Sequence, residues 1–146
     1  MGLRISGGEA RGRRVRVAKG SRLRPTAERV RSALFNALGP PFVQGARVAD
    51  LFAGTGSLGL EALSRGAAWA QFVEADRRLC ATLRESLRSL GLAGRARITC
   101  APVERVLSAL AGPFHLVLVD PPYDYPGLER LLEGLGSSPL VAPGGM

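Results

Sequence analysis

The pattern that most constrains the fold is a repeated alternation of strand and helix between residues 46 and 135. Short apolar segments typical of strands lie at 46–52, 68–74, 95–100 and 114–120. Each is followed by a segment with helical spacing of its apolar side chains, and these helices end near residues 65, 90, 111 and 135. Such alternation is typical of a parallel sheet covered by helices on both faces. The sequence therefore predicts an α/β, Rossmann-like domain with a mostly parallel sheet.

The two ends of the chain differ from this pattern. Residues 4–17 predict two short strands around Gly7-Gly8, and Thr26 is expected to cap a helix that Gly39-Pro40-Pro41 ends. We therefore divide the chain into a small basic β-hairpin-like extension, residues 1–24, and an α/β domain, residues 25–146. The last residues, 141–146, resemble a turn that leads into another strand. The expectation is that C-terminal strands of the sheet are missing from this chain.

The positive charge is concentrated at the N-terminus. The chain carries 20 basic and 12 acidic residues, a net charge of +8. Residues 1–31 hold ten of the basic residues and two of the acidic ones, so the remainder of the chain is neutral. A block of this kind is either a solvated arm or a contact for a polyanion, and arginine favours forked contacts to phosphate. The candidate phosphate contacts are Arg4, Arg11, Arg13, Arg14, Arg16, Arg22 and Arg24.

Several classes of protein are disfavoured by composition. Cys80 and Cys100 with the single His115 do not form a zinc pattern, so we expect no metal. One histidine without a GxSxG motif makes a serine hydrolase triad improbable. No apolar run approaches the roughly 18 residues of a membrane span, and the N-terminus lacks the apolar core of a signal peptide. We expect a cytoplasmic protein without a membrane partner.

A glycine-rich turn follows the first predicted strand of the α/β domain. Gly54, Gly56 and Gly59 match GxGxxG, in which a tight backbone approaches a ligand at a helix N-terminus. Asp50 precedes this turn, and its carboxylate would repel a dinucleotide pyrophosphate but attract a cationic sulfonium. Glu74 closes the next strand, where an acid can accept both ribose hydroxyls. The pair favours S-adenosylmethionine over NAD, and the alternative role of both acids is to cap loop N–H groups.

A second motif, Asp120-Pro121-Pro122-Tyr123, leaves the carboxyl end of the last predicted strand. Open α/β sheets bind ligands at this edge. Consecutive prolines stiffen the loop and lack N–H groups, so the loop presents acceptors only. The Asp120 carboxylate and the Pro121 carbonyl can hold both hydrogens of a nucleobase amine, with its lone pair aimed at a methyl group. Tyr123 supplies a face on which an extruded base stacks.

Together these motifs resemble those of class I S-adenosylmethionine-dependent amino-methyltransferases. Further segments narrow the resemblance: Arg4-Ile5-Ser6-Gly7-Gly8, Arg11-Gly12-Arg13, Arg24-Pro25-Thr26, Arg29-Val30-Arg31 with Leu34-Phe35-Asn36, and Leu58-Gly59-Leu60-Glu61-Ala62-Leu63-Ser64-Arg65. These segments resemble the bacterial 16S rRNA guanine-N2-methyltransferase family.

The resemblance implies a role for each matching position. The methionine part of the cofactor would contact Asp50, Ala53, Gly54, Thr55 and Gly56, and the ribose and adenine would lie against Glu74, Ala75 and Val103, with Asp120 at the methyl group. The target base would contact Asp120, Pro121, Pro122 and Tyr123, and the RNA or cofactor would be covered by Arg24 and Thr26. Where many relatives carry Asp or Asn to read adenine, this chain has Ala101-Pro102-Val103.

The resulting expectation is a monomeric enzyme that methylates the N2 amine of a guanine in small-subunit rRNA, free or in an assembling 30S particle. S-adenosylmethionine is the donor and S-adenosylhomocysteine the product. Three alternatives stay open from the sequence: a DNA adenine-N6 methyltransferase, an NAD-dependent Rossmann enzyme, and a truncated, non-catalytic RNA-binding module.

Overall fold

The structure, a computed structural model, describes residues 2–16, 25–122, 124–136 and 138–146. Its centre is a four-stranded sheet in which every neighbouring pair of strands is parallel. The strands are β3 (Arg47–Leu51), β4 (Trp69–Glu74), β5 (Ala96–Cys100) and β6 (Leu116–Val119), in the order β5-β4-β3-β6. All four lie within the segments that the sequence predicts as strands. The α/β prediction is confirmed.

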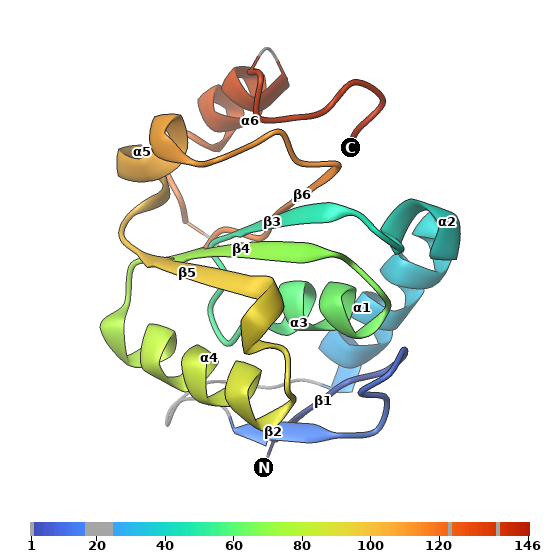
Figure 1. Ribbon diagram of the computed structural model, residues 1–146. Coiled ribbons are helices and arrows are strands. Elements are labelled where there is room, and N and C mark those ends of the chain that lie inside the picture. The colour runs from blue at the N-terminus through green and yellow to red at the C-terminus, as the bar shows by residue number, and fades with distance from the viewer. Residues whose placement is uncertain (1, 17–24, 123, 137) are drawn as a thin grey trace.

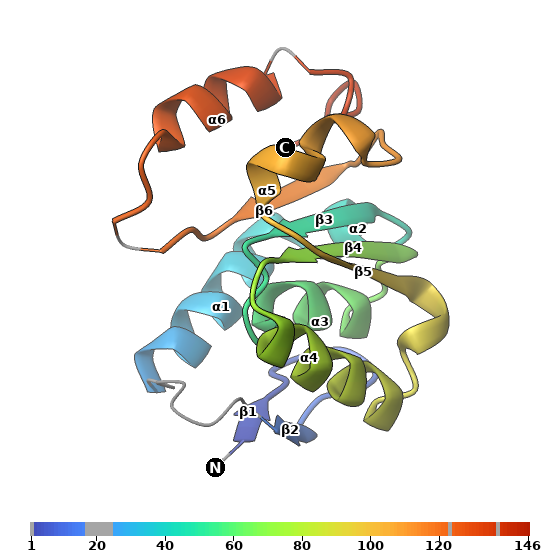
Figure 2. The same ribbon diagram turned by 90° about the vertical axis from the view of Figure 1, so that its left-hand side faces the viewer.

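Helices cover both faces of this sheet (Figures 1 and 2). One face carries α1 (Pro25–Leu38), α3 (Ser57–Ser64) and α4 (Arg77–Ser89), and a short α2 (Pro40–Val43) continues from α1. The other face carries α5 (Val103–Val106) and α6 (Leu128–Gly136). Two 3₁₀ turns, Ala93–Arg95 and Leu107–Ala109, complete the helical structure of the described residues.

Alternation along the strands produces two separate cores. In β3, Val48 joins the core beneath α3 and α4, whereas Ala49 and Leu51 join the core beneath α5 and α6. Phe72 and Leu83 are fully buried in the first core, and Phe114 is almost fully buried in the second. A strand buried on both faces explains why these segments read as nearly continuous apolar runs.

The N-terminal hairpin packs on the domain as a further layer beneath α3 and α4 (Figure 2). β1 (Gly2–Arg4) and β2 (Arg14–Arg16) pair antiparallel, and Ile5 and Val15 are buried in the same core as α3 and α4. The arm is therefore anchored, not a freely solvated appendage. The first strand also lies earlier than predicted, because the chain turns away at Ile5 and returns through a wide connection closed by a bond from Gly12 N to the Ile5 carbonyl, 2.8 Å.

Other boundaries are also corrected. Helix α1 begins at Pro25, which suits the first helical position, so Thr26 lies inside the helix and not before it. The helix expected at 103–111 is α5 plus the 3₁₀ turn at 107–109. Among the described residues no helix is long and apolar enough to cross a bilayer.

Candidate active site

The principal cavity opens at the carboxyl ends of β3, β4 and β6, and has a volume of about 530 Å³. The glycine turn after β3 and the proline segment after β6 both contribute to it. Its described lining residues are Phe52, Ala53, Gly54, Thr55, Ser57, Val73, Glu74, Ala75, Pro102, Val103, Glu104, Asp120, Pro121, Pro122 and Tyr125. The two motifs that the sequence singles out therefore share one space.

The glycines of the turn are required for different physical reasons. Gly54 has φ 59° and Gly56 has φ 84°, conformations that side chains resist. A Cβ at Gly56 would lie 2.3 Å from Leu83 Cδ1, and a Cβ at Gly59 would lie 2.3 Å from Phe72 Cε1. Gly54 thus leaves open space at the cavity, whereas Gly56 and Gly59 let α3 lie close to its neighbours.

Glu74 links the ends of β3 and β4. Its Oε1 accepts a hydrogen bond from Gly54 N at 2.8 Å, and its Oε2 accepts one from Asp76 N at 2.8 Å. This is the capping role that the sequence leaves as the alternative. Each carboxylate oxygen has a further lone pair, and the side chain lines the cavity, so capping and acceptance of ribose hydroxyls are compatible.

Asp50 lies below the cavity and does not line it. Its side chain is buried, and Oδ2 accepts a hydrogen bond from Gly59 N at 3.0 Å. Burial raises the pKa of Asp50 to about 8; the Gly59 bond opposes the rise, and the charges of Asp120 and Glu74 add to it. Burial therefore favours the protonated form of this carboxyl group, and a nearby cation would favour its ionisation.

This raised pKa makes a stability prediction. Between the unfolded and folded pKa values, Asp50 holds a proton in the folded protein that it has lost in the unfolded chain. The contribution of Asp50 to the free energy of unfolding is therefore present at low pH and is lost as pH rises toward 8. We expect Asp50→Asn to remove this dependence. Relative to that variant, the free energy of unfolding of the native chain should fall by about 1.4 kcal/mol per pH unit between pH 5 and 7, measured by urea unfolding. Parallel pH profiles for the two proteins would contradict the assignment.

The segment after β6 places acceptors at the cavity wall. Asp120 is exposed, directly follows β6, and lines the cavity together with Pro121 and Pro122. Neither proline has an N–H, so this stretch of wall offers oxygen acceptors without backbone donors. Tyr123 lies outside the described residues.

Among the lining residues that were not predicted as site residues, Phe52, Glu104 and Tyr125 contact one another through Tyr125. The Phe52 and Tyr125 rings meet edge to face with centroids 4.7 Å apart, and the Tyr125 hydroxyl donates to Glu104 Oε2 at 3.3 Å. Phe52 has φ 60°, a strained conformation for an aromatic residue. All three follow strands at the carboxyl edge, which is the one signal in the sequence that could have indicated them.

The predicted site residues separate into three groups. Seven predicted cofactor residues line the cavity: Ala53, Gly54, Thr55, Glu74, Ala75, Val103 and Asp120. Asp50 and Gly56 support the turn from beneath. The predicted RNA contacts Arg4, Arg11, Arg13, Arg14 and Arg16 are exposed on the hairpin, away from the cavity, whereas Arg22 and Arg24 lie outside the described residues and the side chain of Thr26 is not described.

The lining is acidic. Glu74, Glu104 and Asp120 contribute carboxylates, and none of the described lining residues is basic. No group of three or more metal-ligating side chains occurs in the described part of the chain. The cavity therefore suits a cation better than a phosphate.

A scan against family models matches residues 3–146 to the family described as Conserved hypothetical protein 95. The chain is 46% identical over 140 residues to ribosomal RNA small subunit methyltransferase D of Escherichia coli K12, covering 96% of this chain and 70% of the relative. It is 33% identical over 144 residues to the protein of the same name from Haemophilus influenzae, covering 97% and 74%.

Solved structures of similar proteins share the fold of this chain. The structure described as "Putative methyltransferase yhhF from Escherichia coli" superposes with a TM-score of 0.87 at 42% identity, covering 97% of this chain and 76% of the other. A hypothetical protein of Thermus thermophilus superposes with a TM-score of 0.83 at 38% identity, covering 98% and 82%. The fold is the Rossmann-like fold of class I methyltransferases, and the chain belongs to the bacterial 16S rRNA methyltransferase family that includes ribosomal RNA small subunit methyltransferase D.

Proposed function

We propose that this protein transfers a methyl group from S-adenosylmethionine to the N2 amine of a guanine in small-subunit rRNA. The observation that carries the proposal is the shared cavity, in which the glycine turn after β3 faces the acceptor-lined segment after β6. The names of the relatives support rRNA as the class of substrate. The resemblance of the N-terminal segments supports guanine N2 as the methylated atom.

The cavity fits the cofactor by its charge. S-adenosylmethionine supplies a methyl group bound to a positively charged sulfur, with S-adenosylhomocysteine as the product. The carboxylates of Glu74 and Asp120 line the cavity, so their field favours a sulfonium. A bound cation would in turn favour ionisation of Asp50, which is buried beneath the cavity. The same carboxylates would repel the pyrophosphate of NAD. Glu74 accepts the ribose hydroxyls, and Pro102 with Val103 forms the wall against which an adenine packs.

The segment after β6 orients the target amine. A guanine amine is a poor nucleophile because its lone pair is conjugated with the ring. The Asp120 carboxylate and the Pro121 carbonyl accept its two hydrogens, so the lone pair points out of the base plane toward the methyl carbon. The nitrogen–carbon bond forms as the carbon–sulfur bond breaks, sulfur keeps that electron pair, and Asp120 accepts the amine proton. Positioning and electrostatics supply the catalysis.

The two parts of the chain have different proposed roles. Residues 25–146 carry the whole described cavity, so a single chain suffices and we propose a monomer. Residues 1–24 present arginines to rRNA, and Arg4, Arg11, Arg13, Arg14 and Arg16 are exposed for this purpose. The site of action is the cytoplasm, where the rRNA and the assembling particle are found.

The proposal is tested by incubating the protein and methyl-labelled S-adenosylmethionine with small-subunit RNA, either free or in 30S particles, and in a parallel reaction with duplex DNA. Each nucleic acid is then digested and its nucleosides are identified by mass spectrometry. We expect label in N2-methylguanosine, and no displacement of the cofactor by NAD. Label in N6-methyladenosine of duplex DNA, or RNA binding without any affinity for the cofactor, would overturn the proposal.

A further inference from the structure

Arginines outside the N-terminal block gather on the exposed side of α4. Residues 32–146 are neutral overall, yet α4 carries four exposed arginines, Arg77, Arg78, Arg84 and Arg88, against the single carboxylate of Glu85. Glu85 pairs with Arg88 at 3.4 Å, and both side chains are largely exposed. From Arg77 to Arg88 the helix extends for about 16 Å at 1.5 Å per residue. Arg77, Arg84 and Arg88 therefore lie along one side of the helix, and Arg78 lies about 100° around the axis from Arg77.

Helix stability does not explain the start of this line. Arg77 and Arg78 occupy the first turn of α4, where the helix dipole disfavours cations and favours acids. The acidic groups at this end are already engaged: the cap, Asp76, accepts from Arg78 N at 2.8 Å and Leu79 N at 3.4 Å, and Glu74 accepts from Asp76 N at 2.8 Å. An external anion at this end would instead be favoured by both the arginines and the dipole.

The line begins at the active-site cavity. Ala75 lines the cavity, and Asp76 N is bonded to Glu74, so Arg77 follows directly at the rim. From there α4 runs to the opposite edge of the sheet. A polyanion at this side of the cavity rim would therefore lie next to Arg77.

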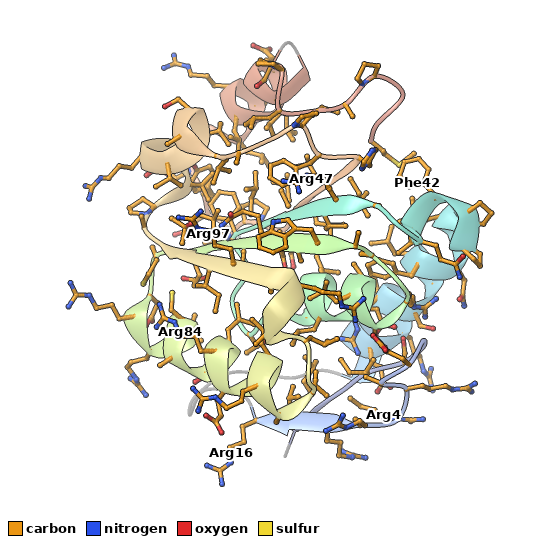
Figure 3. The ribbon with its side chains drawn as sticks, in the orientation of Figure 1. Arg4, Arg16, Phe42, Arg47, Arg84 and Arg97 are labelled. Atoms are coloured by element: carbon orange, nitrogen blue, oxygen red, sulfur yellow. The ribbon has the colours of Figure 1, made fainter. Side chains whose placement is uncertain are left out.

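The hairpin adds two exposed arginines below α4. Strand β2 packs against α4, Val15 points into the core, and Arg14 and Arg16 are exposed. Arg13 donates to the Ser89 carbonyl at the end of α4, which fixes the relative position of the two elements. In Figure 3, Arg84 extends from α4 and Arg16 lies below it.

A hollow between α4 and β5 adjoins this surface. Its volume is about 270 Å³; Arg84 and Arg88 flank it, and Leu87, Ala96 and Ile98 give it an apolar lining. Arginine beside an apolar hollow suits a nucleotide, because the guanidinium contacts phosphate while the sugar or base covers carbon atoms.

We propose that the α4–β2 arginine face, defined as Arg77, Arg78, Arg84 and Arg88 with Arg14 and Arg16, binds the phosphate backbone of the rRNA that extends from the active site. This inference rests on the proposed function. It extends the RNA contact from the N-terminal arm to the α4–β2 arginine face, which starts at the cavity rim. The phosphate contacts position the RNA, whereas the cavity selects the nucleotide.

The chain offers a matched control on the other side of the sheet. Ala96 and Ile98 face α4, so Arg97 between them points to the opposite face, and Arg130 is exposed on α6. The double variant Arg97→Gln/Arg130→Gln removes the same charge as Arg84→Gln/Arg88→Gln or Arg77→Gln/Arg78→Gln. All six side chains are exposed, so each variant should fold and bind S-adenosylmethionine as the native chain does.

The test measures binding of a fluorescent small-subunit rRNA transcript at a series of salt concentrations. Each phosphate contact contributes about 0.7–0.9 to the slope of log affinity against log salt. We expect each α4 double variant to lower that slope by about 1.5, and the control double variant to change it by less than about 0.3. An unchanged slope in the α4 variants, an equal change in the control, or equal competition by duplex DNA would overturn the proposal.

Failure of the proposed function gives a different result. If the native protein neither binds the transcript nor methylates it, the function is wrong whatever the variants do. If the native protein methylates RNA and binds it with a steep salt dependence that the α4 variants retain, only the arginine face is wrong.

Discussion

Replacing Asp120 with alanine should lower the rate of methyl transfer by about 10³-fold, within the range for loss of a positioned proton acceptor. In the proposed mechanism, the variant loses the acceptor that turns the amine lone pair toward the methyl carbon and that takes the proton. Binding of S-adenosylmethionine should weaken by less than tenfold, because Glu74 and the glycine turn remain in the cavity. The measurement pairs single-turnover methylation of small-subunit RNA with calorimetric titration of the cofactor.

Asp124 provides the matched control. It is an exposed aspartate four residues further along the same loop, and it does not line the cavity. Asp124→Ala should therefore keep the native rate. Asp120→Asn should fall between native and alanine rates, since its amide oxygen can accept one hydrogen bond but cannot take the proton. Near-native turnover in Asp120→Ala would remove Asp120 from the mechanism.

The sequence predicted those parts of the molecule whose signal is local. The four strands were located because a parallel strand buried on both faces must be apolar throughout. Gly54 and Asp120 were singled out because they follow such strands, and the carboxyl ends of parallel strands meet at one edge. The shared cavity follows from that topology alone.

The features of the site that the sequence did not predict depend on packing between distant segments of the chain. Whether Asp50 faces the cavity or lies beneath it is decided by how closely α3 approaches β3, which Gly59 permits. The meeting of Phe52 with Tyr125 joins the ends of β3 and β6, and no spacing rule in the sequence indicates it. Arg31 was counted with the basic arm by its position, yet its side chain is only 4% exposed.

Arg31 is buried in an ion pair with Glu61, which is also buried. Glu61 lies on α3 with its carboxylate fully buried, and it holds three segments together. Oε1 accepts from Ser6 N of the hairpin connection at 3.0 Å and from Arg31 Nε of α1 at 3.1 Å, and Oε2 accepts from Arg65 Nε at 2.7 Å. Arg31 in turn donates to the Arg4 carbonyl. Burial alone would raise the pKa of Glu61, but the hydrogen bonds from Arg65, Ser6 and Arg31 outweigh it and lower the pKa.

Glu61→Ala should therefore destabilise the protein by about 3–5 kcal/mol, because it leaves the buried Arg31 without its counter-ion. That is a large part of the roughly 5–15 kcal/mol by which domains are usually stable. Urea unfolding at pH 7 measures the loss. The pKa of Glu61 is lowered in the folded protein. Its contribution to the free energy of unfolding is therefore present above the ordinary glutamate pKa of 4.5 and is lost as pH falls below that value. The difference in free energy of unfolding between the native chain and the variant should shrink in acid.

The matched control is Glu85→Ala, which removes a largely exposed glutamate from another helix and should change stability by less than about 0.5 kcal/mol. Limited digestion with trypsin separates a local effect from a global one. Because Glu61 binds Ser6 directly, its loss should release the hairpin first, and cleavage after Arg11, Arg13 and Arg14 should accelerate before the domain unfolds. Equal stability of Glu61→Ala and Glu85→Ala would show that the buried ion pairs of Glu61 contribute little to stability, and that the apolar contacts and the other hydrogen bonds of the hairpin hold it on the α/β domain.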